Sequence, residues 1–263
     1  MLGVTKMNAA TLRKMLATGL SLLLSMPAGF RAAWAYRPFD GTDAAVADPG
    51  EVEIELQPAG TLWVNAQPAL VAPDIVYNYG LIKDWELVLQ GTGLTPLSPS
   101  GPTELVGGGA FLKHVLREGV LQDKSGPSIA TEFGLLTPDS MGPSKLGAIV
   151  SGIVSQRWDW GTIHFNGDIA LTREQRGDVF AGAIIEGPYQ WKVRPVAEIF
   201  YEEEFGIFHS VSGLVGAIWQ VNDKLSFDVA YRHAETNGHP VEEIRAGMTF
   251  GFQLIPFKPM ERK

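Results

Sequence analysis

Charged and polar side chains recur at every second position in several apolar stretches of this 263-residue chain. Between positions 51 and 56, three glutamates alternate with Val, Ile and Leu, and Thr162, His164, Asn166 and Asp168 alternate mostly with apolar residues. Ionisable groups on one face of a chain can set the ion selectivity of a pore, or they can pair with one another and close it. The same groups must also be tested for catalysis.

Nucleophilic catalysis would need a serine, a histidine and an acid within hydrogen-bonding reach of one another. His209 and Ser210 are adjacent, so on a strand they would point to opposite faces, and His164 has no obvious serine on its own strand. The remaining histidines lack metal-ligand spacing, and the acidic run 202–204 is typical of a solvated loop rather than a calcium site. The sequence also lacks P-loop, dinucleotide-binding and zincin motifs. We therefore expect no catalytic residue, metal site, cofactor or enzymatic activity.

Composition excludes several other classes of protein. The chain has 21 Lys and Arg against 29 Asp and Glu, a formal net charge of -8 and no cysteine. The missing cysteines exclude a disulfide-stapled domain, a thiol enzyme and a cysteine-ligated zinc site. The acidic balance argues against a nucleic-acid partner, which requires a basic surface. With 45% hydrophobic and 19% charged residues, the chain is also too apolar to be disordered.

The first residues have the pattern of an export signal. Three basic residues between positions 6 and 14 precede an apolar stretch at 15–26, and Ala33-Trp34-Ala35 is a small-x-small cleavage site. The apolar stretch is shorter than the ~18 residues that a membrane span requires, which disfavours an uncleaved anchor. We predict a signal peptide over 1–35 and an exported mature chain that begins at Tyr36.

The period of two indicates strands. In 160–171 the odd positions are apolar and the even ones polar, as expected for a strand between two different environments. The uncharged stretch 205–222 contains glycines and polar residues, which suits a strand better than a membrane helix. About twelve strands follow from this pattern, near 51–57, 71–80, 84–91, 104–117, 127–136, 146–157, 160–171, 177–187, 190–201, 208–220, 223–233 and 243–253.

Strand length and loop length favour a membrane barrel. Most of these stretches have 10 to 13 residues, whereas strands of soluble sandwiches have ~5–6, and a tilted strand needs ~9–11 to cross a bilayer. The run 104–117 is the weakest, and a helix is possible there. Short connections follow the even strands at 81–83, 158–159, 187–189 and 221–222, with 118–126 as an exception. Longer ones follow the odd strands at 58–70, 92–103, 137–145, 172–176, 202–207 and 234–242.

These observations predict an all-β fold, an antiparallel up-and-down transmembrane β-barrel whose short turns face the periplasm. Residues 36–50 would form a periplasmic N-terminal segment, 51–254 the barrel and 255–263 a C-terminal tail. Tyr and Trp side chains prefer the membrane interface, although they could also be ordinary core aromatics beside hairpins. Six of them cluster beside the short turns, and we expect them at this interface: Trp85, Trp158, Trp160, Tyr189, Trp191 and Trp219.

Several short motifs resemble, in order, a family of outer-membrane transporters typified by the meta-pathway phenol-degradation protein. They are Pro49-Gly50-Glu51-Val52-Glu53, Tyr79-Gly80-Leu81 with Asp84-Trp85-Glu86-Leu87, Gly126-Pro127-Ser128 with Glu132-Phe133-Gly134, His164-Phe165-Asn166-Gly167, and Arg245-Ala246-Gly247-Met248-Thr249-Phe250. The resemblance implies an outer-membrane barrel with a channel or transport role, and it alone suggests hydrophobic small molecules as solutes. Unlike most such barrels, the chain continues beyond Phe252 instead of ending on an aromatic residue.

The polar face of the strands would line the lumen of the barrel. These side chains could form a narrow, charge-selective pore, or they could pair into a structural plug without transport. A soluble periplasmic β-sandwich that binds a ligand is a third possibility. For a barrel we expect outer-membrane lipid, a small solute and the barrel assembly machinery as partners. The lumen-lining candidates are Glu53, Glu55, Glu86, Glu132, Arg157, His164, Asp168, Lys192, Arg194, Glu198, Asp228, Arg232 and Arg245.

Overall fold

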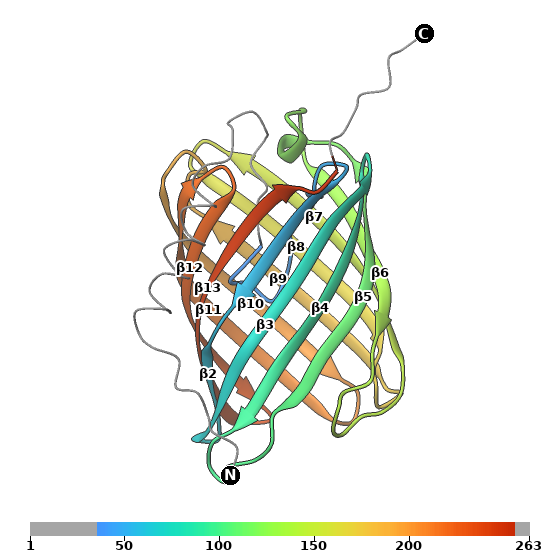
Figure 1. The fold of residues 1–263 in the computed structure, drawn as a ribbon, viewed down its shortest axis with the longest axis vertical. Coiled ribbons are helices and arrows are strands. Elements are labelled where there is room, and N and C mark those ends of the chain that lie inside the picture. Colours follow the sequence, from blue (N-terminus) through green and yellow to red (C-terminus); the bar gives the residue numbers. More distant parts are fainter. Residues whose placement is uncertain (1–35, 256–263) are drawn as a thin grey trace, which may run out of the picture. The chain divides into compact units, whose positions relative to one another are not determined.

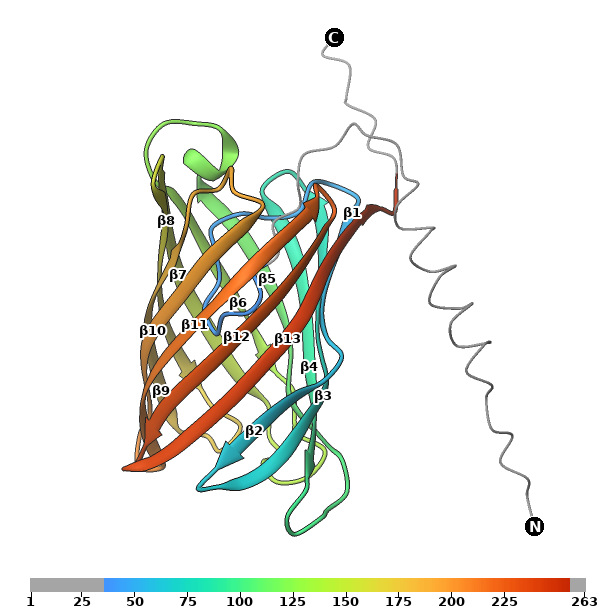
Figure 2. The ribbon, with the colours of Figure 1, turned by 90° about the vertical axis from the view of Figure 1, so that its left-hand side faces the viewer.

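The computed structural model describes residues 36–255. The predicted signal peptide and almost all of the predicted C-terminal tail lie outside these residues. The described residues fall in one compact unit. They form a single antiparallel sheet that closes on itself, because the last strand pairs with the first two strands (Figures 1 and 2). This confirms the predicted barrel and excludes the β-sandwich, which needs two separate sheets.

From the second strand to the last, each strand pairs with its neighbours in the chain, as in an up-and-down barrel. A short 3-10 helix, η1 (Val120–Gln122), interrupts the long turn between the fifth and sixth strands. The strands are β1 (Glu51–Gln57), β2 (Gly60–Val64), β3 (Gln67–Ile82), β4 (Trp85–Pro96), β5 (Glu104–Arg117), β6 (Ser128–Leu136), β7 (Gly147–Trp158), β8 (Gly161–Leu171), β9 (Gly177–Glu186), β10 (Val193–Glu204), β11 (Phe208–Asn222), β12 (Leu225–Thr236) and β13 (His239–Gln253).

The first position of the barrel is shared by β1 and β2. Both pair with β3 on one side and with β13 on the other, so the wall has twelve positions for thirteen strands. The interruption lies at Pro58 and Ala59, where proline has no N–H to give to a ladder. The region 58–70, expected as a loop, is instead the β2–β3 hairpin. Its turn residues Asn65 and Ala66 have φ of 51° and 60°, the left-handed conformation that two-residue hairpins use.

The structure decides two further expectations, which concern residues 104–117 and the loop 234–242. Residues 104–117 form a strand rather than a helix, since β5 is bonded to both β4 and β6. The expected loop 234–242 shortens to the two residues Asn237 and Gly238, because β12 and β13 continue up to this tight turn. Asn followed by Gly suits such a turn, and both have positive φ. Several loops at this end of the barrel are therefore shorter than the sequence suggested, whereas those at 137–146 and 172–176 are not.

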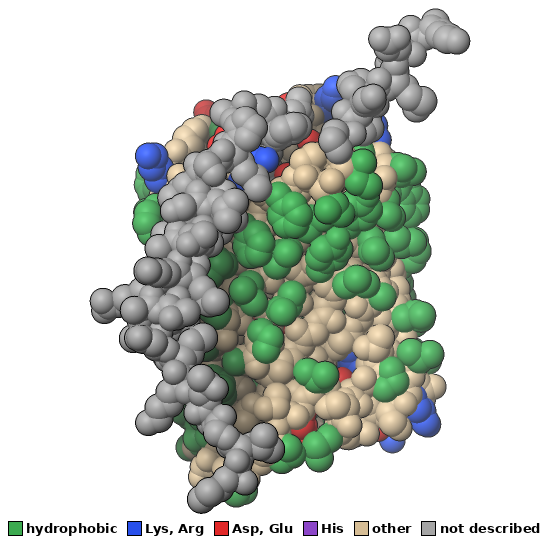
Figure 3. Space-filling view, in the orientation of Figure 1, with side chains coloured by type: hydrophobic (Ala, Val, Ile, Leu, Met, Phe, Trp, Pro, Cys, Tyr) green, Lys and Arg blue, Asp and Glu red, His purple; other side chains and the backbone are tan. Residues whose placement is uncertain are grey.

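The outer face of the wall is apolar. Along β8, β10 and β12, buried and exposed positions alternate, and the exposed positions include Phe165, Ile199 and Val229. Figure 3 shows hydrophobic side chains over the outside, with charged groups mostly near the two ends. Such a surface suits the hydrocarbon region of a bilayer. Within residues 36–255, no helix has the length and hydrophobicity to cross a membrane.

This outer face leads to a first prediction. Ile199 lies midway along β10 and is 61% exposed. We expect Ile199→Arg to lower the free energy of unfolding by about 2–4 kcal/mol, the cost of a guanidinium at the bilayer midplane. Urea titration of the barrel in lipid vesicles would measure it. The matched control is Ile207→Arg, in the loop between β10 and β11, where the cost should be about 0–1 kcal/mol. Equal costs at the two positions would contradict a lipid-facing wall.

Candidate functional site

The inner face of the wall contains nearly all the predicted lumen residues. Glu132, Arg157, Asp168 and Arg232 are partly buried. Lys192 is an exception, because β10 begins only at Val193 and leaves Lys192 exposed in the preceding turn. The other eight are buried: Glu53, Glu55, Glu86, His164, Arg194, Glu198, Asp228 and Arg245.

The interface aromatics all lie at the turn end of the barrel. Trp158 and Trp160 flank the β7–β8 turn with their rings stacked 5.4 Å apart, and Trp85 stacks on His114 at 4.1 Å. Tyr189 and Trp191 lie in the β9–β10 turn, and Trp219 in β11 is paired with Val193 in β10. Five of the six are exposed, and Trp85 is partly covered. The Tyr189 ring lies over the guanidinium of Arg157 at 4.7 Å. Their contact with a membrane interface remains a prediction.

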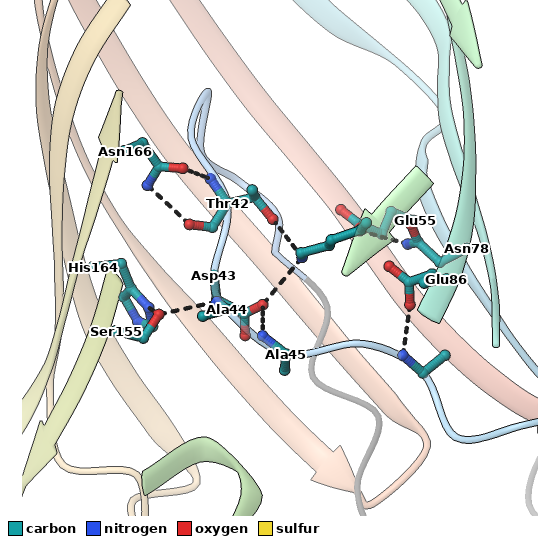
Figure 4. A network of polar contacts seen from close by, with 12 residues as sticks. Thr42, Asp43, Ala44, Ala45, Glu55, Asn78, Glu86, Ser155, His164 and Asn166 are labelled. Atoms are coloured by element: carbon teal, nitrogen blue, oxygen red, sulfur yellow. Dashed lines mark hydrogen bonds and ion pairs between the residues drawn. The ribbon is translucent and has the colours of Figure 1, made fainter. Parts of the chain in front are cut away.

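Residues 36–48 pass through the inside of the barrel (Figure 2). The sequence predicts a periplasmic segment here, whereas Tyr36, Arg37 and Ala44 are buried against the inner wall. We call residues 36–48 the plug. Although the plug has no strand or helix, its buried backbone groups still need partners. Polar side chains of the wall provide these partners (Figure 4).

Carboxylates and an amide of the wall accept hydrogen bonds from the plug backbone. Glu198 accepts both the Asp40 N–H at 2.9 Å and the Gly41 N–H at 2.8 Å. The Ala47 N–H donates to Glu86 at 2.6 Å. Asn166 pairs with Thr42 in both directions, accepting from its N–H at 3.0 Å and donating to its carbonyl at 2.9 Å. An intramolecular hydrogen bond contributes about 0.5–1.5 kcal/mol, and Glu198, which accepts two of them, is a principal anchor.

Arg37 fixes the start of the plug to the wall beside β1. Its guanidinium lies 2.9 Å from Asp74 Oδ2 and 3.4 Å from Asp228 Oδ2, and it donates to Gln57 Oε1 at 2.7 Å. This guanidinium packs against Gly247 of β13, where an added Cβ would lie 2.4 Å from Arg37 Nε. Glycine is needed at 247 because the guanidinium lies directly against the sheet.

Arg245 fixes the next part of the plug. It donates to the Pro38 carbonyl at 2.7 Å, to Asp40 Oδ1 at 2.9 Å and to Glu243 Oε2 at 2.8 Å. Burial alone would raise the pKa of Asp40, but the attraction of Arg245, Arg232 and Arg37 holds that pKa below its usual value. The Asp40 ion pair therefore contributes fully at neutral pH, and its contribution is lost as the pH falls through this lowered pKa.

Lys113 provides a third cationic contact. Its ammonium lies 3.1 Å from Thr42 Oγ1 and 3.4 Å from Asp43 Oδ1, with both charged side chains buried. The Asp43 carboxylate also accepts the Ala45 N–H at 2.9 Å. A single turn of the plug is thereby fixed from β5, β8 and β10 together.

A serine, a histidine and an acid do come together beneath the plug. The Ser155 hydroxyl lies 2.8 Å from His164 Nδ1, and His164 Nε2 lies 3.1 Å from Glu186 Oε1, which Arg194 also contacts at 3.2 Å through the other oxygen. Ser155 is not evident from the sequence around His164, because it lies on β7, directly paired with His164 on β8. Knowledge of the hairpin register would have revealed it.

The surroundings of this relay indicate a positioning role. Ser155 is fully buried and accepts the Ala44 N–H at 3.0 Å, so its hydroxyl oxygen faces the plug backbone. The Tyr36 ring lies edge-on to His164 at 5.0 Å, and burial raises the pKa of the Tyr36 hydroxyl well above its usual value, which keeps it protonated. A cavity of about 20 Å³ beside His164 and Glu186 has room for about one water. The relay therefore supports the plug, because its serine hydroxyl is hydrogen-bonded to the plug backbone.

Carboxylates outnumber cations on the inner face of the wall. The basic groups there are Lys113, Arg157, Arg194, Arg232 and Arg245. An excess of negative charge in a confined space attracts cations and repels anions. The acidic groups are Glu53, Glu55, Glu86, Glu132, Asp168, Glu186, Glu198, Glu202, Asp228 and Glu243.

Comparison with known proteins gives a likeness of fold. No family model matches the chain, and no curated protein matches it. Among solved structures, the COG4313 outer membrane channel from Pseudomonas putida F1 is similar with a TM-score of 0.55 and 9% identity, over 81% of this chain and 100% of that one. A KdgM porin in complex with disordered oligogalacturonate has a TM-score of 0.52 and 8% identity, over 77% and 99%. At these identities the likeness concerns architecture alone, and this chain has the fold of outer-membrane channels and porins.

Proposed function

We propose that this protein is an outer-membrane channel whose lumen is closed by its own N-terminal plug, and that small solutes pass when the plug is displaced. The observation that carries the proposal is the plug itself, an irregular segment fixed inside the barrel by Glu198, Arg245 and Lys113. A closed, lipid-facing barrel requires no such segment for its own hydrogen bonding, because the strands satisfy one another.

The nature of the contacts supports displacement. The contacts described above between the plug and the inner wall use wall side chains, and none of them is a rung of the β-ladder. The plug could leave the lumen without breaking the pairing of any strand. Segments held in this way open at lower free energy than the strands around them.

The solutes that we propose are small molecules that are neutral or cationic. The family resemblance in the sequence suggests small hydrophobic molecules, and the acidic inner wall favours neutral or cationic solutes over anions. The second candidate function is a structural barrel that is permanently plugged. It is favoured by the number of charged contacts that fix the plug, notably the three partners of Arg245.

A disulfide lock would separate these functions. The chain has no cysteine, and the Ala44 N–H lies 3.0 Å from Ser155 Oγ, so Ala44→Cys with Ser155→Cys would place the only two thiols close together. We expect solute uptake into vesicles by the reduced double variant and its loss on oxidation. Ala44→Cys alone is the matched control and should be insensitive to oxidant.

Two results would overturn the proposed channel. Equal uptake by the locked and reduced forms would mean that solute passes without displacement of the plug. The absence of uptake in both forms, for proteins that are folded by heat-modifiability, would favour the permanently plugged structural barrel.

A further inference from the structure

A cluster of buried carboxylates near the start of the plug lacks a matching cation. Glu53 is 5% exposed, and its strongest charged neighbours are Glu55, Glu86, Asp43 and Glu51, all of them acids. Within residues 36–255, the two nearby cations have other partners: Lys113 pairs with Asp43, and Arg37 with acids of β3 and β12. Buried carboxylates are costly unless a cation or several donors compensate them.

The first described residue of the plug lies at this cluster. The Tyr36 backbone N–H donates a hydrogen bond to the Glu55 carboxylate, which also accepts one from Asn78 Nδ2 at 3.0 Å. Tyr36 is itself buried. The backbone nitrogen of residue 36 is therefore placed inside the barrel, against one carboxylate of this acidic cluster.

The predicted cleavage after Ala35 would change the chemistry of this nitrogen. Hydrolysis of the Ala35–Tyr36 peptide bond consumes one water, leaves a carboxylate on Ala35, and frees an amine on Tyr36 that takes up a proton. An amide nitrogen with one donor and no charge becomes an α-ammonium with three donors and a full positive charge. The group gained is the one that the carboxylate cluster lacks.

We propose that the α-ammonium of Tyr36, created when the leader is removed, binds the Glu55 carboxylate, in the acidic cluster that also contains Glu53, and fixes the plug inside the barrel. The lumen thus contains a binding site for the processed N-terminus of its own chain, and processing strengthens the seating of the plug. The inference rests on the plug of the proposed channel, but it does not depend on transport.

Chemical labelling of the N-terminal amine tests this site. The mature protein, purified from outer membranes in detergent, should have the mass of a chain whose first residue is Tyr36. Acetylation with sulfo-N-hydroxysuccinimidyl acetate near neutral pH modifies the unprotonated amine, so each unit by which an ion pair raises its pKa slows labelling about tenfold. We expect the α-amine of the folded protein to react at least about tenfold more slowly than in Glu55→Gln. Glu235→Gln, which changes an exposed acid, is the matched control.

Internal standards and a second variant keep the result decisive. Lys145, exposed in the loop between β6 and β7, should label rapidly, and Lys113, whose side chain is 6% exposed, should be protected in every folded sample. If Glu55→Gln does not fold, a glycine inserted between Ala35 and Tyr36 moves the ammonium by about 3.8 Å and should remove the protection. Equal labelling of the α-amine in wild type and in the folded variant, or a mature N-terminus at another residue, would overturn the proposal. Neither result involves conductance, so a failed channel and a failed N-terminal site are distinguishable.

Discussion

Deletion of residues 36–48 is expected to raise the single-channel conductance of the reconstituted barrel by roughly tenfold or more, because a barrel of this size is wide enough for water once its filling is removed. The wall should remain closed, since β1 starts only at Glu51 and keeps its ladders with β3 and β13. The opened pore should prefer cations, because acids outnumber bases on its inner face. Planar-bilayer recordings in a salt gradient would measure both the conductance and the reversal potential.

The control for this deletion must preserve the length of the chain. Replacement of residues 37–47 by a Gly-Ser linker removes the contacts of Arg37, Asp40 and Asp43 but retains the number of residues. It should also open the pore, with more fluctuation than the deletion. A folded deletion variant that conducts no better than the wild type would mean that wall side chains alone close the lumen.

Much of the fold could be predicted because barrel strands follow a simple period. Alternation identified both faces of β8 and β10, and the tight turns identified the hairpins. Errors occurred where the pattern weakens. Pro58 breaks the run before Gly60–Val64, so the sequence predicts a loop there. Residues 104–117 are ambiguous in the sequence because one face mixes apolar and basic side chains, namely Phe111, Lys113, Val115 and Arg117.

The plug could not be predicted for a physical reason. Residues 36–48 show no regular alternation of apolar and polar side chains. Their conformation is set by contacts with residues that are distant in sequence, such as Asp40 with Glu198 and Ala44 with Ser155. Alternation puts Glu198 and Arg245 on the polar face of their strands. It could not show that these side chains bind a segment of the same chain rather than one another or water. Ser155 was missed for the same reason, because its partner His164 is a neighbour only in the paired hairpin.

Arg245→Met is expected to lower the stability of the plugged barrel by about 3–5 kcal/mol, the usual cost of removing one partner from a buried ion pair. Methionine retains most of the side-chain volume but leaves Asp40 and Glu243 without this cation and the Pro38 carbonyl without its donor. Glu243 still has Arg232 at 2.9 Å, so most of the loss should fall on the plug. Urea unfolding would give the total change, and hydrogen exchange of residues 38–41 would give the local one.

A double-mutant cycle would show that the loss of stability in Arg245→Met comes from the Asp40 carboxylate that is left without its cation. Adding Asp40→Asn to Arg245→Met removes the unpaired carboxylate, so the double variant should be more stable than the sum of the single changes by about 0.5–3 kcal/mol. Arg176→Met, in an exposed loop, controls for loss of a surface arginine and should change stability by about 0.5 kcal/mol or less. In the variant that lacks residues 36–48, Arg245→Met should cost much less, because only the contact with Glu243 remains to be lost. An unchanged cost in that background would place the role of Arg245 in the wall and not in the plug.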